Sequence, residues 1–455
     1  MKQWDPKLNP YKKKKIISKS SLKISPPSVL LLGFVLLIVI GSVLLLLPIA
    51  AHAPTSIIDA LFTATSAVTV TGLVVLDTGT HFSYFGQVVI AILIQAGGLG
   101  FMTFAVVAAL SLGAKLGFNQ QLAMKEALDQ TSMEQVFTTA KLVLLYSFVI
   151  ESVGFVLLTL VWWKDFGFLG AAYQSFFYTI SAFNNAGFAL SSDSLTAYSA
   201  SFSVNFIISA LFITGGIGFA VLIDIKTNKR WRKLTLNTKV VLLASLVLNI
   251  TAFLLIWLLE ASNANTLASL STGEQALAAW FQAVSPRTAG FNTLPIDQLT
   301  DATTTLTILL MFIGGGSLST ASGLKIGTFV VLIVATYTFL KRRNNASLMK
   351  RTVPQAQVMK ALSLAILSVG LIFIGIFLLT VIEDAPFLDI VFEVVSALST
   401  VGLSRGLTSE LSVTGEVVII LMMIIGRIGP LTFAYVIASP KPKKVVYANA
   451  EIQVG

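Results

Sequence analysis

The sequence SAVTVTGL at residues 66–73 is the first of four related strings, and their recurrence decides how the chain folds. The others are SAFNNAGF at 181–188, VSPRTAGF at 284–291 and SALSTVGL at 396–403. Each contains a glycine, and an aromatic residue stands ten positions before that glycine in all four. The glycines are separated by 115, 103 and 112 residues, which predicts four copies of one structural unit. They are Gly72, Gly187, Gly290 and Gly402.

A second glycine cluster follows each of these glycines at a nearly constant distance. The intervals are 25, 28, 24 and 24 residues. One TxxG or NxxG string would carry no weight alone, but four units with two matched landmarks each are strong evidence of repetition. The second clusters lie at 97–100, 215–218, 314–316 and 426–429.

The composition excludes an ordinary soluble protein. Of 455 residues, 55% are hydrophobic and 11% are charged, against roughly 25% charged in an average soluble domain. A soluble fold has no interior large enough to hide that much apolar surface, whereas a bilayer does. The chain has no cysteine, which excludes disulfides, thiolate metal sites and cysteine nucleophiles. Its two histidines, His52 and His81, are too few for a histidine-rich metal or proton-relay site.

Apolar runs occur in pairs, one run on either side of each glycine string. The first run of a pair has about 20 residues or more, enough to cross roughly 30 Å of hydrocarbon as a helix. The stretch between the two runs is too short and too polar to span, so we predict that it re-enters the membrane. The first runs lie at 29–51, 141–163, 240–260 and 358–382, the re-entrant stretches at 56–71, 173–187, 274–290 and 386–402, and the second runs at 85–112, 202–225, 303–340 and 415–438.

Charge predicts the orientation in the membrane. One side, made of the N-terminus, the loops between pairs and the C-terminal tail, holds 26 of the 31 Lys and Arg residues. The opposite side holds 14 of the 21 acidic residues, including Asp77, Asp193 and Asp297. Because cytoplasmic loops are enriched in Lys and Arg, both termini are predicted to be cytoplasmic. The bias repeats in every loop, so the basic run 12–15 indicates topology rather than nucleic-acid binding. The N-terminal 27 residues lack the features of a cleaved signal peptide.

These patterns predict an all-α polytopic membrane protein, in which four helix–re-entrant segment–helix repeats surround one central pore with pseudo-fourfold symmetry. Non-helical backbone at membrane depth is tolerated only where protein buries it or where it lines water. The predicted boundaries are an N-terminal tail (1–28), repeat 1 (29–112), a cytoplasmic loop (113–140), repeat 2 (141–226), a loop (227–239), repeat 3 (240–340), a loop (341–357), repeat 4 (358–438) and a C-terminal tail (439–455).

The glycine strings suit a potassium selectivity filter. Such filters replace the hydration shell of the ion with rings of backbone carbonyls. Glycine lets the chain take a positive φ and turn its carbonyls towards the axis without a Cβ clash. The alternative is that these are ordinary turn or helix-packing glycines, which membrane helices use often. The predicted filter residues, acting mainly through backbone carbonyls, are Val70, Thr71, Gly72, Asn185, Ala186, Gly187, Thr288, Ala289, Gly290, Thr400, Val401 and Gly402.

The second run of the third repeat contains an unusual sequence, GGGSLSTASG at 314–323, followed by Lys325. A stable helix disfavours this content, because each glycine lowers helix stability by up to ~1 kcal/mol. A polar loop below the filter can close the pore when collapsed; the alternative is a kinked helix with no gating role. The predicted gate spans 314–325 and comprises Gly314, Gly315, Gly316, Ser317, Ser319, Thr320, Ser322, Gly323 and Lys325, together with Arg427.

Arg427 lies within an apolar run, where a charged side chain costs about 2.5–3.5 kcal/mol on insertion scales. It is therefore expected to face a water-filled path, as an electrostatic barrier or a contact of the gate, or else to pair with backbone carbonyls of the broken helix. Glu151 and Asp224 also lie in or near membrane runs. For these two we expect helix–helix pairing rather than ion contact.

From residue 27 to about residue 440 the chain resembles the Ktr/Trk/HKT superfamily of potassium transporters, and within it the bacterial Ktr membrane subunit. The strings that carry the resemblance are TVTGL, FNNAGF, PRTAGF, STVGL, GGGSLSTASGLK and IIGRIGPLTF. It implies a filter at the four glycines, an intramembrane gate at 314–325 and Arg427 at the pore below the filter. Glycine in all four repeats implies potassium preference, since some plant relatives with serine in the first repeat favour sodium.

The resemblance also implies a setting and partners. It places the chain in the cell membrane as a homodimer with one pore per protomer, regulated by a cytosolic ring that binds nucleotide. Potassium would be the transported substrate, sodium dependence is suggested, and no bound cofactor or nucleic acid is expected.

Two other classes of protein compete with this reading. Sodium-coupled secondary carriers also contain broken helices, but usually as two inverted repeats with a site at the midplane. A membrane enzyme has no support, because HExxH, GxSxG and Walker motifs are all missing from the sequence. We therefore expect a transporter and not an enzyme.

Overall fold

The structure is a computed structural model that describes residues 26–100, 103 and 132–438. These residues are helical apart from connecting loops and one two-stranded hairpin, so the predicted all-α class is confirmed. Several predicted segments fall outside the described residues. They are the N-terminal tail as far as residue 25, residues 104–131 at the end of repeat 1 and in the loop that follows, and the C-terminal tail 439–455.

Each repeat contributes an outer helix, a short helix and a second helix. The elements of repeats 1 and 2 are α1 (Pro26–Leu45), α2 (Ile57–Thr69), α3 (Tyr84–Gly98), α6 (Met133–Phe183), η1 (Thr196–Tyr198), α7 (Phe202–Ile217), α8 (Phe219–Thr227) and η2 (Trp231–Lys233). Those of repeat 3 and the loop after it are α9 (Leu236–Glu260), α10 (Thr272–Val284), η3 (Ile296–Gln298), α11 (Asp301–Phe312), α12 (Ile326–Leu340), β1 (Ser347–Leu348) and β2 (Arg351–Thr352). Those of repeat 4 are α13 (Gln355–Ile382), α14 (Phe387–Ser399), η4 (Leu407–Glu410), α15 (Val413–Ile428) and α16 (Pro430–Ala438).

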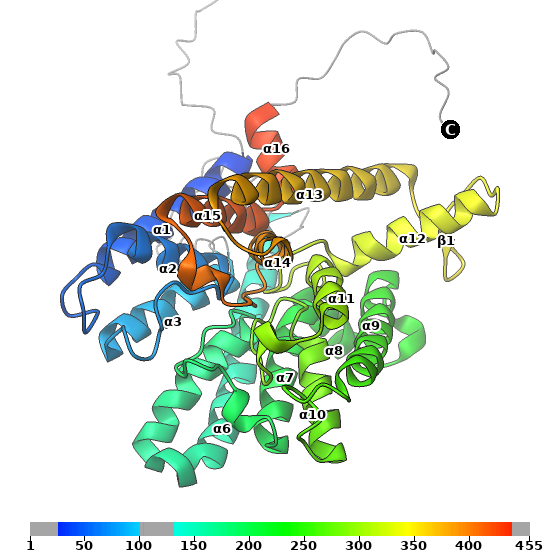
Figure 1. Ribbon diagram of the computed structural model, residues 1–455. Coiled ribbons are helices and arrows are strands. Elements are labelled where there is room, and N and C mark those ends of the chain that lie inside the picture. Colours follow the sequence, from blue (N-terminus) through cyan, green and yellow to red (C-terminus); the bar gives the residue numbers. More distant parts are fainter. Residues whose placement is uncertain (1–25, 101–102, 104–131, 439–455) are drawn as a thin grey trace, which may run out of the picture.

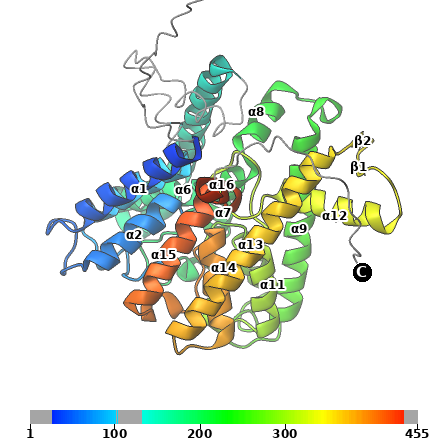
Figure 2. The same ribbon diagram turned by 90° about the horizontal axis from the view of Figure 1, so that it is seen from above.

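The four repeats follow one another round the molecule, from blue through teal and green to orange and red in Figure 1. Helix α3 contacts α6, α7 contacts α10, α11 contacts α14, and α15 contacts α2, which closes the circle. Seen from above, α13 and α15 of the last repeat run side by side (Figure 2). The chain thus surrounds a central axis with its four short helices.

Local signals explain where the short helices begin. The Ser56 side chain caps α2 by accepting a hydrogen bond from the Asp59 backbone N–H at 3.1 Å. Ser271 and Glu274 form a capping box at the start of α10. Such caps satisfy backbone donors that a helix leaves unpaired. Repeat 2 differs, because its outer and short helices form one element of 51 residues that bends at Gly167, where φ is +67°.

The second helices end at the second glycine clusters. In three repeats a glycine of the second cluster lies directly against a backbone carbonyl oxygen near the end of the short helix. This carbonyl belongs to the residue four positions before the string glycine, and a Cβ on the cluster glycine would overlap it. Glycine serves close approach of two backbones at these positions. The chain then turns at Gly218 (φ +103°) and Gly429 (φ +93°). The close pairs are Gly97 with Val68, Gly215 with Phe183, and Gly426 with Leu398.

Repeat 3 departs from this pattern. Its second helix is interrupted between Phe312 and Ile326 by a loop with no helix of its own. Gly314 lies against the carbonyl of Ser322 within that loop, whereas Gly97, Gly215 and Gly426 lie against the short helix of their own repeat. We call residues 313–325 the inserted loop.

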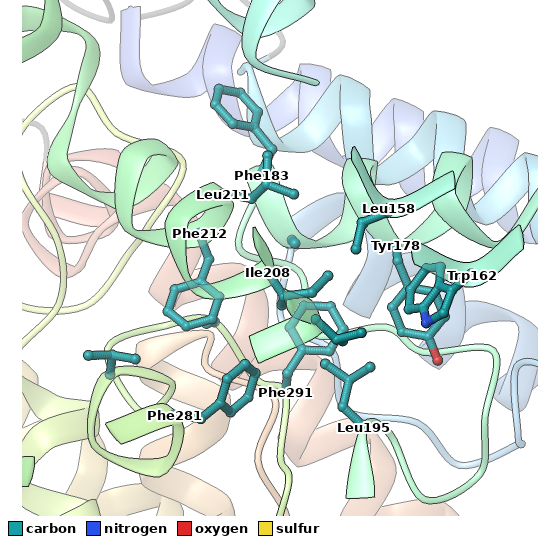
Figure 3. Packing of buried hydrophobic residues seen from close by; sticks show 14 of the residues in the cluster. Leu158, Trp162, Tyr178, Phe183, Leu195, Ile208, Leu211, Phe212, Phe281 and Phe291 are labelled. Carbon is teal, nitrogen blue, oxygen red and sulfur yellow. The ribbon is translucent and has the colours of Figure 1, made fainter. Parts of the chain in front are cut away.

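A core of large side chains joins repeats 2 and 3 (Figure 3). Phe212 of α7 meets Phe281 of α10 edge to face, with ring centroids 5.7 Å apart. Tyr178 of α6 stacks on Phe291 at 6.1 Å. Aromatic contacts of this kind contribute about 0.5–1.5 kcal/mol beyond their buried area. They hold two of the glycine strings in fixed relation to each other.

The outer helices carry the membrane-spanning character of the described residues. Four helices are long and apolar enough to cross a bilayer by length and composition, and they lie in α1, α6, α9 and α13. A fifth span results if α7 and α8, which meet at 90°, are counted together. Side chains such as Phe373 and Phe377 on α13 are 70% and 61% exposed, as expected of a surface that faces lipid.

Because the sequence contains no cysteine, single cysteines can test its orientation. Ser262 follows α9 and Asn344 follows α12, and both are exposed. In intact cells, a membrane-impermeant maleimide should label Ser262→Cys and leave Asn344→Cys unlabelled until the membrane is opened. The opposite pattern would reverse the topology that the charge bias predicts.

Candidate functional site

The four string glycines meet in a closed ring at the centre of the repeats. Each string glycine lies beside a backbone carbonyl oxygen of the next repeat, which belongs to the residue directly before that repeat's string glycine. In every case a Cβ added to the glycine would crowd neighbouring backbone atoms. The order of these contacts runs once round the molecule and returns to its start. The pairs are Gly72 with Ala186, Gly187 with Ala289, Gly290 with Val401, and Gly402 with Thr71. The four predicted three-residue sets, which we call the glycine segments, are therefore brought together.

The way the short helices end places the glycine segments. In α2 the Val70 N–H donates to the Ala67 carbonyl at 3.1 Å and the Thr71 N–H to the Ser66 carbonyl at 2.8 Å. This is a Schellman motif, whose terminal residue takes a left-handed conformation. Val70 has φ +58°, and α6 and α14 end in the same way, with Asn185 at +60° and Thr400 at +51°.

The third glycine segment reaches a similar conformation by another route. Helix α10 ends at Val284, and the Ala289 N–H donates to the Ser285 carbonyl at 2.9 Å. Thr288 nevertheless has φ +71°. In all four segments φ is therefore positive at the first and third residues and not at the middle one. A left-handed residue costs about 1–2 kcal/mol unless it is glycine or asparagine, so this geometry is strained at Val70, Thr288 and Thr400.

A serine at the end of each short helix supports its glycine segment. The hydroxyls of Ser66 and Ser396 accept hydrogen bonds from the N–H groups of Gly72 and Gly402 at 3.0 and 3.1 Å. Two further serines donate instead to the carbonyl of the residue after the glycine: Ser181 to Phe188 at 2.7 Å, and Ser285 to Phe291. Sequence reasoning missed these serines, although three strings begin with Ser-Ala and the fourth has serine one position later.

A cavity of about 490 Å³ opens above the ring, and all four ring glycines line it. Three acidic residues from different repeats also line it: Asp77, Asp193 and Asp297. Burial alone would raise the pKa of Asp77. Hydrogen bonds from Ser192 and Thr80 lower this pKa by more than burial raises it, so it lies below its ordinary value. The Asp77 carboxylate therefore stays charged into mildly acidic solution, and the cavity attracts cations.

Two buried hydroxyls in the glycine segments have no hydrogen-bond partner among the described residues. They are Oγ1 of Thr288 and Oγ1 of Thr400, whose residues are 0% and 1% exposed. A buried hydroxyl without a partner costs free energy. An ordered water within reach of either hydroxyl would relieve that cost.

The inserted loop lies beside α7. Its two ends meet, since Gly314 N–H donates to the Leu324 carbonyl at 2.9 Å and Gly323 adjoins Gly314. Gly316 N–H donates to the Gly216 carbonyl at 2.8 Å. Residues 315–322 therefore form a compact excursion from the chain that backbone contacts hold in place. Within the inserted loop only Ser317 is exposed.

Arg427 contacts this loop and a second element. Its guanidinium donates to the Thr320 carbonyl at 2.6 Å and to the Ser322 hydroxyl at 3.1 Å. It also donates to the carbonyls of Gly97 and Gly98 at the end of α3. Lys325 donates to the Ala321 carbonyl within the loop. Two of the predicted gate residues, Thr320 and Ser322, therefore contact Arg427, and its other carbonyl partners belong to α3 and not to the broken helix of repeat 3.

Glu151 and Asp224 pair with protein groups. The Glu151 carboxylate on α6 accepts from the Gln95 amide of α3 at 2.9 and 3.1 Å. Asp224 on α8 accepts from the backbone and hydroxyl of Thr235, both at 2.9 Å, at the start of α9. Helix–helix pairing was the expectation for both residues.

Sequence reasoning also missed Arg287, in the string VSPRTAGF. Its guanidinium donates to Asn249 Oδ1 at 2.9 Å, to the Ser245 hydroxyl at 3.3 Å and to the Gly314 carbonyl at 3.3 Å. It thus joins α9 and the inserted loop to the third glycine segment. The available signal was a charged residue inside an otherwise uncharged string.

The chain has relatives among known proteins. Residues 28–446 match the family described as TrkH, cation transport protein. The chain is 46% identical to Ktr system potassium uptake protein B of Bacillus subtilis (strain 168), over 95% of this chain and 98% of that protein. It is 39% identical to the potassium/sodium uptake protein NtpJ of Enterococcus hirae, over 91% and 93%.

A solved structure has a similar fold. The potassium transporter TrkH from Vibrio parahaemolyticus matches with a TM-score of 0.76 and 20% sequence identity, over 92% of this chain and 86% of that one. The predicted arrangement of four repeats agrees with this likeness of fold.

Two glycines of repeat 4 can test the ring contact. Gly402 (φ +92°) lies against Thr71, whereas Gly406 (φ +103°) has open space where a Cβ would be. Gly406→Ala should lower stability by about 1 kcal/mol through left-handed strain. Gly402→Ala should lose a further ~1–3 kcal/mol through overlap with the neighbouring repeat. The readout is the melting temperature of purified protein, and equal losses would contradict the ring contact.

Proposed function

This chain belongs to the TrkH family of cation transport proteins, and we propose that it takes up potassium through the ring of glycine segments under control of the inserted loop. The observation that carries the proposal is the closed ring, in which backbone from all four repeats meets below an acidic cavity. The names of its relatives, which are potassium uptake proteins, support potassium as the substrate. From here on we call the four glycine segments the filter and the inserted loop the gate loop.

Backbone geometry explains how the ring would select potassium. Potassium filters repay the loss of hydration with carbonyl oxygens, and discrimination depends on the number and placement of these oxygens. Residues of alternating handedness turn successive peptide groups in the same sense, which presents their carbonyls along one side of each segment. The left-handed strain at Val70, Thr288 and Thr400 supports a functional role, because such strain concentrates at functional sites.

The membrane potential supplies the driving force for uptake. An inside-negative potential contributes about 2.3 kcal/mol per 100 mV for each charge. At about 1.4 kcal/mol per tenfold change, this sustains roughly fifty-fold accumulation without ATP hydrolysis. The acidic cavity raises the local concentration of cations at the entrance, with Asp77, Asp193 and Asp297 as its charged groups.

An open conduit would dissipate the potential, so it needs a gate. The gate loop carries Lys325 and binds Arg427, so two basic side chains lie near each other beside the predicted path. In the closed state the positive charge on Arg427 would repel a potassium ion that leaves the filter. Displacement of the loop would remove the obstruction and separate Arg427 from its Thr320 contact.

We extend the proposal to partners of the membrane subunit. A cytosolic nucleotide-binding partner would dock on the basic inner face, which includes Arg230, Arg232 and Arg351, and the membrane subunit would form a homodimer with both termini cytoplasmic. The relative named a potassium/sodium uptake protein supports an influence of sodium on transport.

Gly72→Ser tests the filter most simply. The new Cβ would overlap the Ala186 carbonyl and strain a backbone at φ +95°, so the ring should distort and potassium should lose ligands. We expect transport to persist and the preference for potassium over sodium to fall about fivefold or more. Fivefold is the change that ~1 kcal/mol of strain produces if it acts on the binding of potassium alone. Competitive uptake of the two ions in a transport-deficient host, with membrane abundance measured alongside, gives the result.

Gly167→Ser is the matched control for this substitution. It adds the same side chain at a left-handed glycine (φ +67°) that has open space and lies at the bend of α6, away from the ring. Its ion preference should equal that of the parent. If Gly72→Ser keeps the parental preference at normal abundance, the filter assignment fails.

Deleting residues 315–322 tests the gate. Gly314 and Gly323 already adjoin, so the chain can close with little rearrangement. Purified protein in liposomes, driven by a potassium gradient with no nucleotide or second solute, should conduct faster after the deletion. A correctly folded deletion with unchanged or lower flux would argue against a gate, and parental flux that required a second solute would favour a coupled carrier.

A further inference from the structure

Thr320 of the gate loop connects three parts of the structure. Its backbone N–H donates to the Gly215 carbonyl of α7 at 3.3 Å, and its carbonyl accepts from Arg427 at 2.6 Å. Its hydroxyl lies 2.9 Å from Oδ1 of Asn185 and 3.2 Å from the Phe183 carbonyl. The residue is 1% exposed, so each of these groups depends on protein partners.

Asn185 is the first residue of the second filter segment. Its backbone is left-handed, with φ +60°, and its N–H is already used by the Ala182 carbonyl. The side chain is therefore the part of Asn185 that reaches the gate loop. The next carbonyl along the segment, that of Ala186, lies against Gly72 in the ring. A shift of Asn185 would reach the ring within one peptide unit.

We infer that Thr320 positions the selectivity filter through the Asn185 side chain, so that the gate loop influences which ion passes as well as how fast. This inference rests on the proposed function of the filter and the loop. While the loop is closed, the hydroxyl of Thr320 holds the buried amide of Asn185. When the loop moves away, the amide loses that partner, and the Schellman motif alone maintains the left-handed backbone.

A second contact of the same kind joins the loop to the third filter segment. Arg287 stands directly before Thr288, and its guanidinium donates to the Gly314 carbonyl at 3.3 Å. The first residue of the first segment, Val70, has no polar side chain with which to make such a contact. The gate loop is therefore tied to the second segment by the Asn185 side chain and to the start of the third by the side chain of Arg287, the residue before it, and its displacement would act on the ring unequally.

The test compares two substitutions of Thr320. Thr320→Val keeps the branched shape and removes the hydroxyl, whereas Thr320→Ser keeps the hydroxyl. Purified proteins in liposomes are assayed by competitive uptake of radioactive rubidium and sodium. The preference of Thr320→Val for rubidium should fall about fivefold or more, as expected for loss of a buried hydrogen bond, and Thr320→Ser should keep the parental preference.

Ser322→Ala separates positioning from gating. It removes a contact of Arg427 with the loop at 3.1 Å but leaves the Thr320–Asn185 contact in place. This variant should conduct faster with an unchanged ion preference. If Thr320→Val also conducts faster with an unchanged preference, the loop gates the pore without positioning the filter, and the inference is overturned.

Asn185→Gly approaches the same contact from the filter side, and it decides the matter if Thr320→Val does not fold. Glycine adopts the left-handed backbone freely and lacks the amide. The preference of Asn185→Gly for rubidium over sodium should fall as in Thr320→Val. The double variant with both substitutions should lose no more of this preference than either single variant. An unchanged preference, or additive losses, would overturn the inference. A parent protein with no preference between rubidium and sodium would instead overturn the proposed function.

Discussion

In the ring, each of four glycines lies beside a backbone carbonyl of the neighbouring repeat, with no room for a Cβ. This close approach brings non-helical backbone from four repeats round one axis. Within a membrane such backbone is stable only if its polar groups are paired within protein or face water. The Schellman ends of three short helices and the four supporting serines provide that pairing, while the acidic cavity above provides the water. The outer helices and the aromatic core then hold the repeats at the spacing the ring requires.

The same constraint accounts for the second glycine clusters. A second helix can cover the end of a short helix only if its own backbone touches a carbonyl there, as Gly97, Gly215 and Gly426 do. In repeat 3 Gly314 lies instead against the Ser322 carbonyl of the gate loop itself, and polar groups of the loop pair with Arg427, Arg287 and the α7 backbone. The element proposed to move is therefore joined to α7 by close backbone contacts, and to α15 and the third filter segment by the side chains of Arg427 and Arg287.

Much of this arrangement could be predicted from the sequence, because repetition shows which positions are equivalent. The four ring glycines, the re-entrant stretches and the unusual loop sequence of repeat 3 all follow from spacing and composition. The left-handed backbone of Val70 and Thr400 could not be predicted, because β-branched residues disfavour it and the cap imposes it. Nor could the role of Arg287 or the Thr320–Asn185 contact, since these partners are 27 and 135 residues apart and meet only when the repeats close. The breaks at Gly218 and Gly429 were not predicted, because glycine is common within membrane helices and does not by itself show where a helix ends.

A potassium filter must hold an ion within the ring, and anomalous X-ray scattering from crystals grown with rubidium or thallium would locate that ion directly. We expect anomalous density on the central axis, between the carbonyl oxygens of Thr71, Ala186, Ala289 and Val401, and its loss when sodium replaces the heavier ion. Density confined to the acidic cavity or lying between helices away from the axis, with none in the ring, would contradict the assignment of these four segments as a potassium filter.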